Sequence, residues 1–200
     1  MNFEGKVAVI TGSSAGIGAE AAKKISALGG KVTINYSKSK EAAEEVAHEC
    51  SHLGGSPLII KSDIATDEGC KHLIDSAFSE LGAINILINN AGVAHVGNIE
   101  ACSEEDLDRL YEINIKGVYN CSKACISLMK DSGGGVILNL ASIASSVGIS
   151  DRFAYSMTKG AVLTMTYSIA KDYINHNIRC NCVSPARVHT PFVDGFIKKN

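Results

Sequence analysis

Residues 6–30 read KVAVITGSSAGIGAEAAKKISALGG and contain three structural signals in succession. The apolar run Lys6–Thr11 is too short for a helix and predicts a buried parallel strand. A turn with three glycines follows, at Gly12, Gly16 and Gly18, and after it the residues have a helical pattern. A strand, a glycine-rich turn and a helix in this order predict the first unit of a dinucleotide-binding fold.

Each glycine of this turn has its own expected role. Gly12 permits the tight turn, Gly16 lets the backbone approach a pyrophosphate, and Gly18 lets the helix pack on the strand. The helix N-terminus then offers free N–H groups and a positive dipole end to phosphates. The spacing is G-x-x-x-G-x-G rather than G-x-G-x-x-G, so a tight turn without a phosphate is the alternative. A P-loop is excluded because no Gly-Lys-Ser/Thr follows.

The rest of the chain alternates between strand and helix patterns. We expect further strands at Lys31–Asn35, Pro57–Lys61, Asn85–Asn89, Gly135–Leu140 and Ile178–Val183. We expect helices at Ser39–Leu53, Thr66–Leu81, Ser103–Met129 with a break near Asn114, and Phe153–Asn175. This alternation predicts one α/β domain over residues 1–200, with a parallel sheet and helices on both faces.

Composition excludes several classes of protein. The chain has 200 residues, of which 46% are apolar and 20% charged, as in globular domains. A formal net charge of -2 gives no electrostatic case for nucleic acid or an anionic membrane. No apolar run reaches the roughly 18 residues of a membrane span. Seven cysteines without a Cys-x-x-Cys, and a strand almost directly after Met1, predict free thiols and a cytoplasmic location.

Two pairs of potential metal ligands have a spacing of four residues. Cys121 and Cys125 could share a helix face, and so could His48 and His52. A metal site needs further ligands, which the sequence does not supply at a recognisable spacing. We therefore predict no metal site and interpret these side chains as packed thiols and solvated imidazoles.

The stretch from Ser142 to Lys159 carries the candidate chemistry. Tyr155 and Lys159 form an i,i+4 pair on one face of a predicted helix. A neighbouring ammonium favours the phenolate, so a lowered pKa would make Tyr155 a proton donor and acceptor near neutral pH. Ser142 follows a predicted strand, at the edge where open α/β sheets bind ligands, and could hold a carbonyl oxygen. A chance surface pair is the alternative.

The second predicted strand indicates which dinucleotide is preferred. Dinucleotide folds often carry an Asp or Glu about 20 residues past the glycines to bind the ribose 2′-OH of NAD. Residues 31–40 contain no carboxylate, and their candidate polar groups are Asn35, Tyr36, Ser37, Lys38 and Lys40. Because these groups could accommodate a 2′-phosphate, we expect NADP(H) to be favoured, with NAD(H) possible. A simple solvated loop is the alternative.

Five motifs follow one another along the chain: Thr11-Gly12-x-x-x-Gly16-Ile17-Gly18, Asn89-Asn90-Ala91-Gly92, Asn114, Ser142 and Tyr155-x-x-x-Lys159. In order and spacing the set resembles the short-chain dehydrogenase/reductases, which include 3-oxoacyl-carrier-protein reductases and glucose dehydrogenases. Each motif alone is weak, whereas the ordered set is specific and covers the whole chain. The resemblance implies a Rossmann-like doubly wound sheet of strand order 3-2-1-4-5-6 and an NAD(P)-dependent alcohol–ketone interconversion.

The resemblance also implies roles for single residues. The implied catalytic residues are Asn114, Ser142, Tyr155 and Lys159. The implied cofactor-binding residues are Gly12, Ser14, Gly16, Ile17, Gly18, Ser37, Asp63, Ile64, Asn90, Tyr155, Lys159, Val188 and Thr190. Asp63 would bind adenine, Asn90 would lie beside the cofactor ribose, and Asn114 would help to hold a water chain to Lys159. Lys159 would also bind the nicotinamide ribose, and Val188 and Thr190 would hold the nicotinamide amide.

The chain departs from the family pattern in two places. Pro185-Ala186 stands where the family usually has Pro-Gly, so the backbone there is expected to be more restricted. Family members continue through another helix and a seventh strand, whereas this sequence stops at Asn200, inside what resembles the start of the substrate lid. We therefore expect the seventh strand to be missing and the sixth to form an unprotected sheet edge.

The expected activity is most like that of a 3-oxoacyl-carrier-protein reductase. A sugar or polyol dehydrogenase is the alternative, because the stretch Arg187–Pro191 is polar. A non-catalytic NADP-binding or truncated regulatory subunit is the alternative of another class. A serine hydrolase is disfavoured because Ser142 lies in no Gly-x-Ser-x-Gly elbow. The expected partners are a small carbonyl or alcohol substrate and further copies of the chain, in a homodimer or homotetramer.

Overall fold

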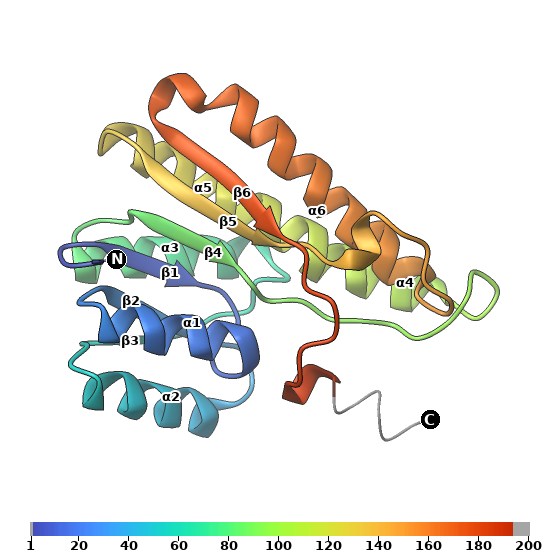
Figure 1. The fold of residues 1–200 in the computed structure, drawn as a ribbon, viewed down its shortest axis with the longest axis horizontal. Helices are drawn as coiled ribbons and strands as arrows, with labels where there is room; N and C mark the ends of the chain where they lie inside the picture. The colour runs from blue at the N-terminus through green and yellow to red at the C-terminus, as the bar shows by residue number, and fades with distance from the viewer. Residues whose placement is uncertain (1, 194–200) are drawn as a thin grey trace.

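The computed structural model describes residues 2–193, which form a doubly wound α/β domain (Figure 1). Its strands are β1 Val7–Ile10, β2 Lys31–Tyr36, β3 Leu58–Lys61, β4 Ile86–Asn89, β5 Gly135–Leu140 and β6 Ile178–Val183. They pair in parallel in the order β3-β2-β1-β4-β5-β6, which confirms the predicted topology. Among the described residues, β6 is one edge of the sheet. The expected end of the chain within the lid falls on 194–200, outside the described residues.

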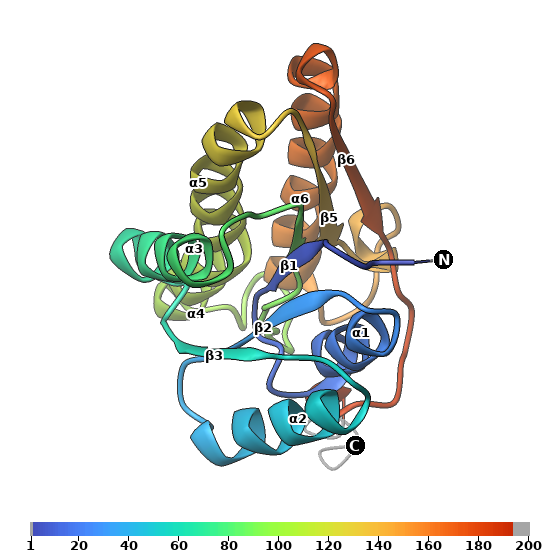
Figure 2. The same cartoon turned by 90° about the vertical axis from the view of Figure 1, so that its left-hand side faces the viewer.

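Six α-helices connect the strands. They are α1 Gly16–Ala27, α2 Lys40–His52, α3 Asp67–Leu81, α4 Glu104–Leu110, α5 Gly117–Asp131 and α6 Phe153–Asp172. Helices α1 and α2 lie on one face of the sheet, and α3, α5 and α6 on the other (Figure 2). Parallel neighbours require such crossovers. The two helical layers bury the central strands β1 and β4, whereas the edge strands β3 and β6 keep exposed residues. Within residues 2–193 no helix has the length and apolar character needed to cross a membrane.

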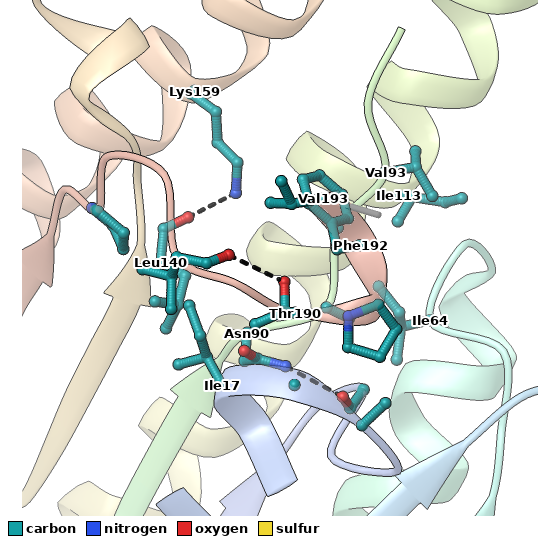
Figure 3. A pocket seen from close by; sticks show the side chains of 18 of the residues that line it. Ile17, Ile64, Asn90, Val93, Ile113, Leu140, Lys159, Thr190, Phe192 and Val193 are labelled. Atoms are coloured by element: carbon teal, nitrogen blue, oxygen red, sulfur yellow. Dashed lines mark hydrogen bonds between the residues drawn. The ribbon is translucent and has the colours of Figure 1, made fainter. Parts of the chain in front are cut away.

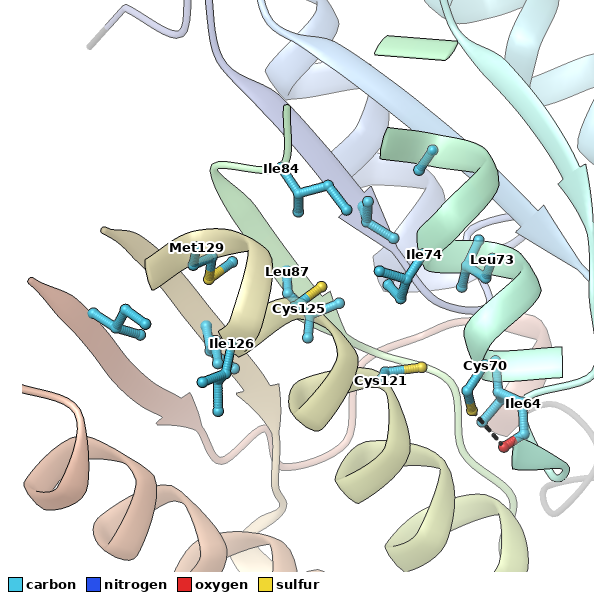
Figure 4. Packing of buried hydrophobic residues seen from close by; sticks show 14 of the residues in the cluster. Ile64, Cys70, Leu73, Ile74, Ile84, Leu87, Cys121, Cys125, Ile126 and Met129 are labelled. Carbon is cyan, nitrogen blue, oxygen red and sulfur yellow. Dashed lines mark hydrogen bonds between the residues drawn. The ribbon is translucent and has the colours of Figure 1, made fainter. Parts of the chain in front are cut away.

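Each face of the sheet has its own hydrophobic core. Apolar side chains of α3 and α5 pack against the central strands on one face, as Figure 4 shows for Ile74, Leu87 and Met129. Cys121 and Cys125 belong to this cluster and are fully buried, which confirms that these thiols are packing residues. On the opposite face, alanines of α1 and α2, together with Ile25 and Val46, cover β1 and β2. The two cores fix the sheet between the helical layers.

The long helix expected at Ser103–Met129 is interrupted near Asn114, as predicted. The interruption is one π-helical turn, Tyr111–Lys116, between α4 and α5. A π-helical turn accommodates an extra residue within a helix and is often found at functional sites. The last predicted helix ends earlier than Asn175, because Tyr173 closes α6 and a 3-10 turn, Ile174–His176, follows.

A buried polar network joins the C-terminal half of the sheet to the helices above it. Asn89 donates hydrogen bonds to Ser122 at 3.0 Å and to the Asn139 Oδ1 at 2.8 Å. The Asn139 Nδ2 in turn donates to the Thr166 hydroxyl at 2.9 Å. These side chains are buried, so each hydrogen bond replaces water that the group lost on folding. The network ties α5 and α6 to two adjacent strands.

Replacement of Asn139 by alanine tests this network. Asn139→Ala removes one of two hydrogen bonds from the Asn89 amide, which keeps Ser122. It also removes one from the Thr166 hydroxyl, which keeps the Val162 carbonyl. We expect a loss of about 1–3 kcal/mol in unfolding free energy. Asn181→Ala, at an exposed position of β6, is the matched control. The measurement is equilibrium urea denaturation of both variants. A difference between them of less than about 1 kcal/mol would contradict the importance of the network.

Candidate functional site

A pocket of about 370 Å³ lies at the carboxyl ends of the strands (Figure 3). The glycine turn after β1 forms its floor, and Tyr155 and Lys159 of α6 close one end. The segment that follows β6 runs along the strand ends and forms another wall. This is the place where open α/β sheets bind ligands, because loops from both sides of the topological switch point meet there.

Gly12 and Gly18 let the turn pack tightly against the loop after β4. Gly12 has a φ of 61°, and a Cβ at this position would come within 2.9 Å of the Ala91 Cβ. A Cβ on Gly18 would lie 2.5 Å from the Asn90 Nδ2, which donates to the carbonyls of Thr11 at 2.9 Å and Gly12 at 3.1 Å. The expected contact of Gly18 with the strand is therefore a contact with the Asn90 side chain and the turn backbone.

The N-terminus of α1 is suited to hold a pyrophosphate. Its N-cap residue Ala15 makes no side-chain cap, and the first turn contains no acidic side chain. The first N–H groups and the positive dipole end therefore face the pocket without a competing anion. Gly16 has a φ of 59°, which favours glycine, and a Cβ there would make only ordinary contact with the Thr190 Cβ of the opposite wall, at 3.5 Å. The residues present fit a dinucleotide phosphate.

Asn35 has a different role from the one expected. Its side chain is buried, and its Oδ1 accepts a hydrogen bond from the Gly12 N–H at 2.9 Å. Its Nδ2 donates to the Ser62 hydroxyl at 3.0 Å. Asn35 therefore clamps the glycine turn to β2 and β3 and is not available for a 2′-phosphate. Tyr36 is likewise in the core, and Lys40 pairs with Glu44 at 3.2 Å. Of the other two candidates, Ser37 lies in the pocket wall and Lys38 is exposed next to it in the chain.

Lys159 is the charged group at the closed end of the pocket. Its side chain is only 6% exposed, and its Nζ donates to the Leu140 carbonyl, at the end of β5, over 2.6 Å. Burial lowers the pKa of Lys159 to about 8, because the charged form loses its hydration. The Nζ lies 5.8 Å from the centre of the Tyr155 ring, so the two residues share one helix face as predicted.

The expected lowering of the Tyr155 pKa by Lys159 is wrong for this structure. Burial raises the pKa of Tyr155, while a hydrogen bond with Ser142 and the positive charge of Arg152 lower it to a smaller extent. The ammonium of Lys159 is directed to the Leu140 carbonyl, and burial makes Lys159 lose its proton more easily by lowering its pKa. Desolvation therefore outweighs the nearby charges, and the phenol keeps its proton at neutral pH.

Ser142 is fixed beside Tyr155 by a capping box. It precedes a 3-10 turn, Ile143–Ser145, and its hydroxyl accepts from the Ala144 N–H at 3.2 Å. The Ser145 hydroxyl accepts from the Ser142 N–H at 3.1 Å and donates to the Lys159 carbonyl at 2.9 Å. Ser145, which we did not predict, thus couples the position of Ser142 to α6. A serine three residues after the candidate Ser142 is the sequence signal for this box.

Asn114 holds the π-helical turn against the loop after β4. Its Oδ1 accepts from the Val93 N–H and its Nδ2 donates to the Val93 carbonyl, both at 2.9 Å. Its Nδ2 also donates to the Thr158 hydroxyl at 3.0 Å. Gly92 lies between this side chain and Lys159: a Cβ there would be 3.2 Å from the Asn114 Oδ1 and 3.5 Å from the Lys159 Nζ. Glycine therefore leaves room between the two polar groups.

Most of the predicted site residues meet at this pocket. Those in its lining are Gly12, Gly16, Ile17, Ser37, Asp63, Ile64, Asn90, Tyr155, Lys159, Val188 and Thr190. Ser14, Gly18, Asn114 and Ser142 are not in the lining, although Gly18, Asn114 and Ser142 contact residues that are.

An apolar part of the pocket wall was not predicted. Val93, Ile113, Phe192 and Val193 gather on one side of it (Figure 3). The Phe192 ring lies 6.4 Å from the Tyr155 ring, centre to centre, so it borders the candidate acid. Apolar residues in strand- and helix-like sequences are indistinguishable from core residues, and the sequence therefore offers no signal for this wall.

Comparison with known proteins accounts for this arrangement. Residues 6–200 match the short chain dehydrogenase family. The chain belongs to the short-chain dehydrogenase/reductase family. It is therefore an oxidoreductase of a family that acts on CH–OH groups, as the motifs predicted.

Three relatives illustrate the similarity. An uncharacterized oxidoreductase of Thermotoga maritima is 42% identical over 185 residues, which span 92% of this chain and 72% of the relative. The structure of a 3-ketoacyl-(acyl-carrier-protein) reductase from Brucella melitensis in complex with NADH has a TM-score of 0.91 at 33% identity, covering 96% and 80%. That of an NAD+-bound xylitol dehydrogenase has a TM-score of 0.90 at 29% identity, covering 93% and 72%.

The lowered pKa of Lys159 gives a testable pH dependence of stability. Its folded-state pKa of about 8 is below its ordinary value of 10.5, so between these values the unfolded chain binds more protons. The stability contribution of Lys159 therefore rises with pH across this window, by on the order of 1 kcal/mol per pH unit.

The measurement is urea denaturation from about pH 7.5 to pH 9.5, an interval that spans the lowered pKa. Burial raises the pKa values of Cys50, Cys125 and Cys180, and these thiols lower stability at alkaline pH. The informative quantity is thus the difference in unfolding free energy between the unmodified chain and Lys159→Met. The exposed Lys130→Met is the control. If this difference in unfolding free energy does not grow with pH, the pKa of Lys159 is not lowered by burial.

Proposed function

We propose that this chain reduces a ketone to a secondary alcohol with a bound nicotinamide cofactor. The observation that carries the proposal is the half-buried Tyr155 phenol beside Ser142 and Lys159, at one end of a pocket whose floor is a glycine turn. A neutral phenol and a hydroxyl at this point provide a proton and a hydrogen bond to a carbonyl oxygen. The cofactor, when bound, supplies the hydride that the protein has no group to provide.

The raised pKa of Tyr155 suits the reductive direction. The phenol stays protonated until negative charge develops on the carbonyl oxygen, and it then donates its proton to that oxygen. Ser142 is held by its capping box and keeps its hydroxyl directed at the same oxygen, so no reorganisation is needed as charge appears. The two hydroxyls thus orient the substrate and stabilise the alkoxide.

Lys159 and Asn114 complete the proton path in this proposal. With a pKa of about 8, the Lys159 amine exchanges a proton readily at physiological pH and can restore the proton that Tyr155 donates. The space beside Gly92, between the Asn114 Oδ1 and the Lys159 Nζ, suits a water that carries a proton to the amine. The Oδ1 and the Nδ2 of Asn114 are both hydrogen-bonded to the Val93 backbone, so this space keeps its shape.

Replacement of Tyr155 tests the proposed acid. Tyr155→Phe keeps the ring and removes the proton, so we expect kcat to fall about 10²–10⁴-fold while NADPH binding stays nearly unchanged. Tyr167→Phe, at an exposed position of the same helix, is the control and should retain activity. Steady-state kinetics and a fluorescence titration of NADPH measure the two quantities. Cofactor binding without turnover by the unmodified chain would instead favour a non-catalytic NADP-binding subunit.

The apolar wall supports a 3-oxoacyl thioester as the substrate class. Val93, Ile113 and Phe192 offer a hydrophobic surface next to Tyr155, which suits an acyl chain beside its ketone. The similarity to the Brucella melitensis reductase agrees with this class. A sugar or polyol is the second candidate, because the similarity to xylitol dehydrogenase is almost as close. A higher kcat/KM for a ketopentose than for a short 3-oxoacyl thioester would favour the second candidate.

We propose that the cofactor is preferentially NADP(H). Ser37 lies in the pocket wall at the end of β2, and residues 31–40 carry no carboxylate to bind the ribose hydroxyls of NAD. Ser37 therefore leaves room for a 2′-phosphate and can donate a hydrogen bond to it.

Ser37→Asp tests this preference. The new carboxylate repels a 2′-phosphate, so the variant should bind NADH more tightly than NADPH, whereas the unmodified chain should show the reverse order. In the control Ser37→Asn, the new side chain is as large as Asp but uncharged, and we expect this variant still to bind NADPH more tightly than NADH. Titration of NADPH and NADH, each followed by its own nicotinamide fluorescence, measures the two affinities. Tighter binding of NADH by the unmodified chain would make the proposed preference wrong.

The proposed assembly is a homodimer or homotetramer. Tyr119 on α5 is 50% exposed and Tyr167 on α6 is 61% exposed, and both helices lie on the same face of the sheet. Exposed aromatic residues on adjacent helices are typical of interfaces. A cytoplasmic location remains a prediction from the free thiols.

A further inference from the structure

Two histidines on α2 lie together on the protein surface and are not among the residues that line the pocket. His48 and His52 are one helical turn apart, both are exposed, and their ring centres are 4.1 Å apart. Together with Glu49 and Leu53 they line a shallow hollow at the end of the helix. No part of the proposed reaction uses these side chains.

The hydrogen bond of His52 determines which ring nitrogen is available. Its Nδ1 lies 2.9 Å from the carbonyl oxygen of His48. A carbonyl oxygen can only accept, so the Nδ1 must carry the hydrogen, and the Nε2 then presents its lone pair to the surface. A hydrogen bond from the second ring nitrogen to a backbone carbonyl is the contact that metal-binding histidines usually make, because it fixes the tautomer and the ring orientation.

The surroundings favour a cation over an anion. The hollow lies at the C-terminus of α2, where the last carbonyls and the helix dipole give a partial negative charge. Glu49 adds a carboxylate to the same hollow. Glu49 is held by Lys23 at 2.8 Å, and Lys23 also pairs with Glu20. The carboxylate therefore contributes charge near the rings without being free to bind an ion itself.

In contrast to the expectation from the sequence alone, we propose that His48 and His52 chelate one late first-row divalent cation, such as Zn²⁺, with water in the remaining coordination positions. A Zn–N bond is about 2.1 Å, so two imidazole nitrogens on one ion lie roughly 3–4 Å apart. From ring centres 4.1 Å apart, rotation of the exposed His48 side chain brings its ring nitrogen to this distance while His52 keeps its hydrogen bond. Imidazole ligands select zinc, copper and nickel over magnesium and calcium, which prefer oxygen.

The site is a binding site and not a hydrolytic centre. The sequence His48-Glu-Cys-Ser-His52 has the H-E-x-x-H pattern of zinc proteases, in which the Glu acts as general base. Here Glu49 is paired with Lys23, and within residues 2–193 no group of three His, Cys, Asp or Glu side chains is placed to hold a metal. Two protein ligands and a solvated ion give reversible binding at the surface, as expected when most coordination positions are water.

The test is a calorimetric titration of Zn²⁺ into the 200-residue chain in a buffer without chelating groups. We expect one site that weakens at least about tenfold in both His48→Gln and His52→Gln, because either change removes one of two ligands. His72→Gln is the matched control, since His72 is a single exposed histidine on α3 whose Nδ1 also has a hydrogen-bond partner, Ser76. This control should bind Zn²⁺ like the unmodified chain, and any binding by thiols is common to all four proteins.

A second readout follows the rings themselves. In ¹H–¹⁵N spectra of the histidine side chains, one equivalent of Zn²⁺ should shift the signals of His48 and His52 together and leave His72 in place. Equal affinity of His48→Gln or His52→Gln and the unmodified chain would overturn the proposal, as would a shift of only one of the two rings. Because neither residue belongs to the pocket, these outcomes are independent of the reductase assays.

Discussion

The buried ammonium of Lys159 is the constraint on which the site depends. A charge in the interior is tolerated only when it is hydrogen-bonded, and here the partner is the Leu140 carbonyl at the end of β5. The Lys159 backbone carbonyl meanwhile accepts from the Ser145 hydroxyl, which also fixes Ser142. The end of β5, the 3-10 turn and α6 therefore form one hydrogen-bonded unit. Tyr155 takes its position in the pocket from that unit, one helical turn before Lys159.

The same means of support recurs across the carboxyl edge of the sheet. Asn35 closes the gap between the glycine turn and two strands, and Asn90 ties that turn to the loop after β4. Asn114 joins this loop to α6 through Thr158. Side-chain amides suit these places because one amide donates and accepts at once, and so satisfies backbone groups of two segments. Loops that would otherwise be mobile become a rigid frame for a ligand.

Periodic features of this protein could be predicted from the sequence, whereas features that depend on environment could not. The parallel sheet followed from the alternation of elements and the pocket from the glycine turn, because both are local patterns, whereas the strand order was implied only by the family resemblance. The direction of the Tyr155 pKa was predicted wrongly, since spacing reveals a nearby charge but not how deeply the phenol is buried. Asn35 looked like a phosphate ligand for the same reason: its burial depends on Ser62, 27 residues further along the chain. The apolar wall around Phe192 has no pattern of its own.

The π-helical turn between α4 and α5 restricts how the gene can vary in length at this point. An extra residue in a helix rotates everything after it by about 100°, since an α-helix has 3.6 residues per turn. Helix α5 buries Cys121, Cys125 and Met129 with that rotation in place. Loss of one codon within Tyr111–Lys116 would restore regular α-helical bonding but turn these side chains out of the core. The irregular helix is therefore locked in by the packing that follows it, and insertions or deletions should be rarer here than substitutions.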